Sequence, residues 1–118
     1  MDRDDEAVRA IPLRPAHFHI LLSLVDGPVH AYGVRHAVEE RTGGRILLAA
    51  GTLYETFQRM GRDGWVEETD PPGELEGPVS SRWRFYEITS FGRRILEAEV
   101  ARLEADLAVA RKTMAPVG

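Results

Sequence analysis

The chain has 118 residues, of which 43% are hydrophobic and 29% charged, with a formal net charge of −4 and no cysteine. This length holds one compact domain with an appended helix rather than two independent cores, and the composition is that of a globular protein in water. The lack of cysteine excludes disulfides and thiolate metal sites. No apolar run approaches the length that spans a membrane, so we expect a cytoplasmic protein.

The negative charge is concentrated in one segment of the chain. Residues 67–81 contain five acidic residues and no basic ones, whereas residues 15–66 contain five of each and residues 82–118 contain seven basic and five acidic residues. Local charge, rather than the total, governs what a surface can bind. The net acidity therefore does not exclude a nucleic-acid partner.

The first half of the chain predicts an arm and two helices. Residues 1–14 are charged and lack periodicity, which predicts a mobile arm. A helix is predicted from Pro15 to Gly27, because apolar residues recur at spacings of three and four. A second helix is predicted from His30 to Thr42, before a glycine pair that ends it. The core face of the first helix is expected to hold Phe18, Leu21, Leu22 and Val25.

Four histidines fall in these two helices, but their spacing does not favour a metal site. His17 and His19 lie about 200° apart around one helix, and His30 and His36 lie about 240° apart around the other. Zinc and copper need ligands that converge on one point. We therefore expect neither a bound metal nor a cofactor.

Residues 51–62 predict a short amphipathic helix, after a brief strand or extended link at residues 45–48. Leu53, Phe57 and Met60 fall within one narrow arc at about 100° per residue. The opposite side carries hydrogen-bonding groups of several kinds. These are Thr52, Glu55, Gln58, Arg59 and Arg62.

The remaining segments predict a hairpin and a long helix. Residues 65–69 and 82–89 are rich in aromatic and branched residues and predict two strands, separated by a loop at residues 70–81. A helix is then predicted from Ser90, as its N-cap, to Thr113. Its apolar residues are spaced as in a coiled coil and predict a homodimer, although a helix packed on its own domain has a similar pattern. This seam consists of Leu96, Val100, Leu103, Leu107, Ala110 and Met114.

Three helices followed by a β-hairpin form the layout of a winged helix-turn-helix domain, in which the third helix enters the DNA major groove. We therefore predict a mainly α fold: an arm at 1–14, a DNA-binding domain at 15–89, a dimerisation helix at 90–114 and a tail at 115–118. Arginine pairs with guanine, glutamine with adenine, and glutamate accepts from cytosine. Base reading is accordingly expected from Glu55, Gln58, Arg59 and Arg62, and phosphate contacts from Thr52 and Tyr54. Tyr32, near the start of the preceding helix, could present its hydroxyl to a phosphate or pack half-buried on a neighbouring helix.

The sequence also resembles the PadR family of bacterial transcriptional regulators. The matching segments are ILLSLVDGPVHAYGV (20–34), ERTGGRILLAAGTLYETFQRMGRDGWVEE (40–68) and RFYEITSFGRRILEAE (84–99). This resemblance implies a dimeric repressor on an inverted-repeat operator, released by a small aromatic or drug-like ligand. It matches Tyr32, Thr52 and Tyr54 to family positions at the helix starts, and for Tyr32 it implies a contact to the DNA backbone, whereas the base-reading positions vary within the family. No residue is assigned to an effector site.

The hairpin departs from that family, whose wing is usually basic. Here Trp83 and Glu87 stand where arginine is common, and the loop carries Glu74 and Glu76. Phosphates would repel such a tip. Wing contacts are therefore expected from Arg82 and Arg84, at the base of the returning strand.

Two other classes of function compete with DNA binding for this sequence. An enzyme would need a nucleophile with its base, paired carboxylates in a cleft or a phosphate-binding loop, and the sequence contains no such motif. The alternative is a winged-helix interaction module that docks a protein partner through its acidic loop. Steep salt dependence of binding to duplex DNA would separate the two, because DNA binding releases counterions.

Overall fold

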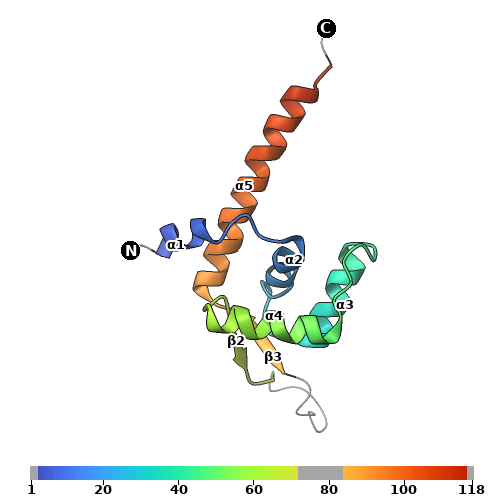
Figure 1. The fold of residues 1–118 in the computed structure, drawn as a ribbon, viewed down its shortest axis with the longest axis vertical. Helices are drawn as coiled ribbons and strands as arrows, with labels where there is room; N and C mark the ends of the chain where they lie inside the picture. The colour runs from blue at the N-terminus through green and yellow to red at the C-terminus, as the bar shows by residue number, and fades with distance from the viewer. Residues whose placement is uncertain (1–2, 72–83, 117–118) are drawn as a thin grey trace.

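The structure is a computed structural model that describes residues 3–71 and 84–116 of the chain. It measures 64 × 39 × 26 Å, and the long last helix extends beyond the other elements (Figure 1). The helices are α1 (Arg3–Arg9), α2 (Pro15–Ser23), α3 (Ala31–Arg41), α4 (Ala50–Arg62) and α5 (Ser90–Met114). The strands are β1 (Val29–His30), β2 (Val66–Thr69) and β3 (Phe85–Ile88).

The three strands form one antiparallel sheet in the order β1-β3-β2. The predicted hairpin is present as β2 and β3, with Val66 opposite Ile88 and Thr69 opposite Phe85. Residues 45–48 form no strand; they bend away from the end of α3 and connect it to α4. The third strand is Val29–His30 instead. Two residues are too few for a period-2 pattern, so this strand depends on its pairing with β3.

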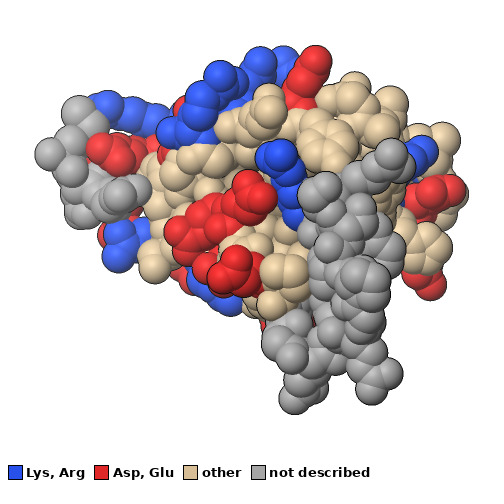
Figure 2. Space-filling view, turned by 90° about the horizontal axis from the view of Figure 1, so that it is seen from below, with Lys and Arg blue, Asp and Glu red and all other residues tan. Residues whose placement is uncertain are grey.

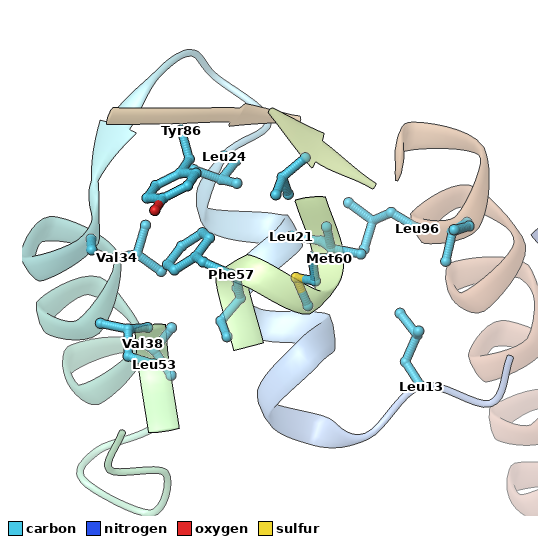
Figure 3. Close-up of a cluster of buried hydrophobic side chains, with 14 of the residues drawn as sticks. Leu13, Leu21, Leu24, Val34, Val38, Leu53, Phe57, Met60, Tyr86 and Leu96 are labelled. Atoms are coloured by element: carbon cyan, nitrogen blue, oxygen red, sulfur yellow. The ribbon is translucent and has the colours of Figure 1, made fainter. Parts of the chain in front are cut away.

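The core lies under the sheet, between α2, α3, α4 and the first half of α5 (Figure 3). Phe57 of α4 is fully buried, and its ring stacks on that of Tyr86 in β3, with centroids 4.2 Å apart and planes at 14°. On the α3 side, Val34 lies beside Phe57 and Val38 beside Leu53 (Figure 3). The predicted apolar face of α4 is confirmed, because Leu53, Phe57 and Met60 are at most 2% exposed.

The buried surface of α2 is wider than the predicted face, of which Leu21 is the fully buried member. Its most buried residues are Ile20 and Leu21, followed by Leu24 just after the helix. Phe18, Leu22 and Val25 are only partly buried. The reason is that α2 packs against both α3 and α5, so its buried surface spans two neighbours.

The N-terminal segment is a helix rather than the mobile arm that its charge pattern predicts. Helix α1 packs against α5 and buries Ala7, while Asp4 lies 3.7 Å from Arg94 of α5 as an ion pair. Leu13, which follows, is also buried. A seven-residue helix is too short to be stable alone, so it depends on this contact. Sequence periodicity cannot reveal a helix of that kind.

Thr89, rather than the predicted Ser90, caps α5 and joins it to the turn before β2. Its Oγ1 accepts a hydrogen bond from the Gly92 amide at 3.0 Å, and the hydroxyl is placed to donate to the carbonyl oxygen of Gly64 or Trp65. Gly92 is required here, because a Cβ at this position would collide with the Trp65 carbonyl oxygen. The junction fixes the direction in which α5 leaves the domain.

Candidate nucleic-acid interface

Helix α4 is held by its buried face and presents the opposite face to solvent. Thr52, Glu55, Gln58, Arg59 and Arg62 are all exposed, as the sequence predicts. The N-cap residue Ala49 makes no side-chain capping hydrogen bond, so the first amides of α4 remain available to an acceptor. Such a helix start favours an anion. The structure thus combines a polar face with an anion-accepting end on one rigidly packed helix.

Tyr54 differs from the polar-face residues of α4 because it is only half-exposed. It lies near enough to Tyr86 to influence that group electrostatically. Burial is the main cause that raises the pKa of Tyr86, and the nearby Glu68 carboxylate adds to it. Tyr86 therefore stays a neutral phenol beneath α4. The side chain of Tyr54 is partly covered by protein and partly exposed to solvent.

The start of α3 is fixed by His30, where the sequence predicts the helix to begin but gives no sign of a capping side chain. His30 Nδ1 accepts a hydrogen bond from the Gly33 amide at 2.9 Å, which caps the helix, and its ring packs edge-on against Phe85. Histidine is not among the usual capping residues, so no sequence signal marks this role. Tyr32 follows directly and is 43% exposed. The cap orients it toward solvent at the first turn of α3.

The sheet beside α4 carries a group of acidic side chains. Glu67 on β2 is directly opposite Glu87 on β3, and a hydrogen bond with Glu67 is the first of the causes that raise the pKa of Glu87. Figure 2 shows this lower side of the molecule, with acidic residues near its centre and basic residues along one edge. Arg84 is exposed but lies 3.9 Å from Glu68 as an ion pair, so its charge is partly balanced. Arg82, Trp83, Glu74 and Glu76 lie outside the described residues.

The residues of the predicted dimerisation seam on α5 differ in exposure: the first is buried, and the later ones are exposed to solvent. Leu96 is 6% exposed and belongs to the core of its own domain, not to a free seam. Farther along the helix Val100 and Leu103 are about 40% exposed, and every side chain at residues 103–116 is exposed, including Leu107, Ala110 and Met114. Glu99, which the heptad pattern places beside the seam, is instead buried at 2% exposure. Leu96 and Glu99 are both buried because α1 and α2 pack against the first half of α5.

The histidines do not converge. Burial, with Arg14 and Arg59 nearby, lowers the pKa of His17, and burial, with Arg41 and Arg45 nearby, lowers that of His19. Within the ranges 3–71 and 84–116, no three histidine, aspartate or glutamate side chains are grouped so as to hold a metal ion. In the same ranges, no helix is both long and apolar enough to cross a membrane.

Helices α2, α3 and α4 with the β2–β3 hairpin define a winged helix-turn-helix domain, to which α5 adds a long projecting helix (Figure 1). Residues 20–98 match the transcriptional regulator PadR-like family. The chain belongs to this family of transcriptional regulators.

Two solved structures have a similar fold, and one further protein has a similar sequence. A transcriptional regulator from Clostridium thermocellum superimposes with a TM-score of 0.65 at 20% identity, covering 84% of this chain and 89% of that one. Bacillus subtilis PadR, solved in complex with operator DNA, superimposes with a TM-score of 0.59 at 16% identity, covering 74% and 47%. An uncharacterized 37.1 kDa protein in transposon TN4556 of Streptomyces fradiae is 32% identical over 84 residues. Those residues are 71% of this chain but 21% of that protein, so the chain spans about a fifth of its length.

Proposed function

We propose that the protein is a dimeric repressor that binds an inverted-repeat operator, with α4 of each protomer in a major groove, and that a small ligand releases it. The observation that carries this proposal is the division of α4 into a buried apolar stripe and a fully exposed polar face. The stripe holds the helix rigidly, and rigid helices present base-reading groups most accurately.

The groups on α4 match the chemistry of base pairs. Arg59 and Arg62 can each donate two hydrogen bonds to guanine, Gln58 can pair with adenine, and Glu55 can accept from cytosine. Thr52 and the free amides at the start of α4 suit a phosphate, as does exposed Tyr32 at the start of α3. Tyr54 is half-exposed and can donate its hydroxyl to a phosphate.

The second half of α5 supports a dimer. It leaves the domain with an exposed apolar row at Leu103, Leu107 and Met114. An open groove of about 420 Å³ lies beside the first half of α5, where Leu22 and Val25 of α2 face Leu96 and Val100. Each protomer therefore offers both a projecting apolar helix and an apolar groove.

Charge favours an antiparallel arrangement of the two α5 helices. Glu97 and Glu104 line the groove together with Arg93, and Arg111 and Lys112 lie in the last turn of α5. An antiparallel partner would bring its basic end toward the two glutamates, with Glu104 lying farther along α5 than Arg93. A two-fold dimer of this kind reads two half-sites of opposite direction, which is why we propose an inverted repeat.

The acidic surface on β2 and β3 limits the contribution of the wing. Glu67, Glu68 and Glu87 would repel phosphates, and Arg84 is engaged with Glu68. We therefore assign most of the affinity to α4 and to the starts of α3 and α4. The same acidic surface is the observation that favours the second candidate function, a winged-helix module that docks a basic protein partner.

A gel-shift titration with the promoter of the protein's own gene tests the proposal. Wild-type affinity should fall steeply between 50 and 200 mM salt, about as expected for several phosphate contacts. Arg59→Ala should weaken binding by about 1–3 kcal/mol and relax sequence preference. Arg9→Ala, on exposed α1, is the matched control and should change neither. Negligible affinity for duplex DNA even at 50 mM salt would favour the protein-docking function instead.

A further inference from the structure

A pocket of about 270 Å³ lies between the start of α2 and one side of α4. Thr52, Thr56 and Arg59 line it from α4, and their spacings of four and three place them on one side of that helix. In the view of Figure 1, α2 lies above α4, whereas β2 and β3 lie below it. The pocket therefore flanks the polar face of α4 on the side opposite the strands of the wing.

The polar lining of the pocket is mainly cationic. Arg14 and Arg59 are exposed, and neither forms an ion pair with any residue that the structure describes. Both lie near His17 and lower its pKa in addition to the larger effect of burial, so the ring is neutral at pH 7 and carries one N–H donor. Glu55 also lines the pocket but pairs with neither arginine. Two guanidinium groups thus outweigh the carboxylate of this lining.

A hydroxyl group adds a further donor to the pocket. The Thr56 hydroxyl donates to the Thr52 carbonyl oxygen at 2.8 Å, so it is engaged within α4. The side chain of Thr52 is exposed and lines the same pocket. Its hydroxyl is therefore placed to donate to a ligand, alongside the guanidinium of Arg14 and the ring N–H of His17.

The two flanks of α4 differ in charge. An α-helix with its side chains is about 10–12 Å across and the major groove is about 12 Å wide, so phosphates border a helix in the groove on both sides. On the wing side, Glu67 and Glu87 repel phosphates, and Arg84 is engaged with Glu68. On the α2 side, the phosphates meet the cationic pocket instead.

We propose that Arg14, His17 and Thr52 form a phosphate clamp that holds one phosphate of the DNA backbone at the start of α2. The clamp supplies the backbone contact that the acidic wing does not. A guanidinium matches a phosphate through two parallel hydrogen bonds, and the hydroxyl and the ring N–H add single ones. Arg59 stays directed to a base, while its charge adds to the attraction. The clamp rests on the proposed function and extends the DNA contacts to α2.

The first test compares Arg14→Gln with wild type on the promoter fragment and on an unrelated duplex of the same length. Affinity for both should fall by one factor, about tenfold, because a phosphate contact carries no sequence information. The slope of log affinity against log salt should become shallower by about 1. Arg14→Lys keeps the charge and should keep the slope. Arg9→Gln removes the same charge from α1 and should change neither quantity.

Three results of this comparison would overturn the clamp. An unchanged salt slope in Arg14→Gln would show that Arg14 neutralises no phosphate. A loss of affinity confined to the promoter fragment would make Arg14 a reader of sequence. A slope that is shallower in Arg14→Lys as well would mean that Arg14 acts through the structure rather than through its charge.

A second test locates the phosphate. A neutral methylphosphonate replaces one phosphate after another along the promoter fragment. At one position in each half-site, the replacement should weaken wild-type binding about tenfold and weaken Arg14→Gln no further, because the two changes remove the same contact. If the two losses add at every position, no single phosphate meets Arg14, and the proposal is wrong.

The ring of His17 gives an independent signal from the same place. The charged groups around it are Arg14, Arg59 and Glu55, and the Trp65 ring lies edge-on with centroids 6.4 Å apart. A phosphate in the clamp offsets the two guanidinium charges, so the pKa of His17 should rise in the DNA complex. A nuclear magnetic resonance titration measures this rise. An unchanged pKa would place the phosphate elsewhere and refute the clamp.

Inorganic phosphate and the wild-type protein supply the remaining controls. If inorganic phosphate at the concentration of the duplex raises the pKa of His17 as much as DNA does, the site serves a free anion and the clamp is wrong. Wild type that binds no duplex DNA even at 50 mM salt would refute the proposed function and the clamp together. Wild type that binds DNA, with Arg14→Gln indistinguishable from it, would refute the clamp alone.

Discussion

The buried carboxylate of Glu99 offers the sharpest test of how α5 is attached to the domain. Its Oε2 accepts a hydrogen bond at 2.7 Å from the amide of Leu13, 86 residues away in the sequence, and its Oε1 accepts one from Arg102 Nε. Arg102 in turn contacts Asp106 at 3.0 Å. The carboxylate therefore fastens the α1–α2 connection to α5.

Removal of this carboxylate should destabilise the protein measurably. Glu99→Ala leaves the buried Leu13 amide without an acceptor, which costs about 1–3 kcal/mol, and we expect about 2 kcal/mol in total. For a chain of this length, that lowers the melting temperature by about 8 °C. Glu99→Gln keeps an acceptor but loses the charge that faces Arg102, so we expect it to lower the free energy of unfolding by about 1 kcal/mol. Thermal and urea unfolding measure the stability of both variants. The protein concentration is kept fixed, because the stability of a dimer depends on it.

The pH dependence gives an independent check. The hydrogen bond from Arg102 is the main cause that lowers the pKa of Glu99, so its stabilising effect is complete above the ordinary value of 4.5 and is lost as the pH falls through the folded-state pKa. The difference between wild type and Glu99→Gln should be constant near neutral pH and shrink below pH 4.5. Glu39→Gln, at an exposed position of α3, is the control, and its stability should stay equal to that of wild type across this pH range. An Ala variant within about 0.5 kcal/mol of wild type, or a Leu13 amide that keeps its hydrogen-exchange protection, would refute the reasoning.

Three further changes test other parts of the structure. Leu103→Glu should yield a monomer by light scattering, because it puts a charge into the proposed seam, whereas Val109→Glu on the other side of α5 should stay dimeric; a dimeric Leu103→Glu would contradict the seam. Glu87→Gln removes the like charge opposite Glu67. Since the pKa of Glu87 is raised, the variant should have a higher melting temperature than wild type at neutral pH, and this gain should fade in acid. It should also bind DNA more tightly at low salt. A gain in melting temperature that does not depend on pH would argue against repulsion between Glu67 and Glu87. Thr89→Val should lower the unfolding free energy in urea by about 1–2 kcal/mol through loss of the α5 cap, while Thr89→Ser, which keeps the hydroxyl, should stay close to wild type.

The parts of the fold that sequence patterns predicted are those with a long local repeat. The stripe of Leu53, Phe57 and Met60 defined α4 because three buried residues recur at helical spacing, and the polar face followed from the same geometry. The β2–β3 hairpin and the extent of α5 were likewise predictable from branched residues and a heptad pattern. Each of these signals lies within one continuous segment.

Features that join distant segments were not predictable from such patterns. Helix α1 is stabilised by α5, β1 exists because β3 pairs with it, and Glu99 is buried because Leu13 reaches it. His30 acts as a cap through a geometry that its residue type does not signal.

The sequence by itself determined a winged helix-turn-helix domain with a polar third helix, since amphipathic periodicity is a local property of the chain. The tertiary structure decided which part of α5 is free, because Leu96 is covered by its own domain and Leu103 is not. It also brought Arg14 and Arg59 to one pocket, 45 residues apart in sequence. Both outcomes depend on how α1, α2 and α5 pack together, and no single segment encodes that packing.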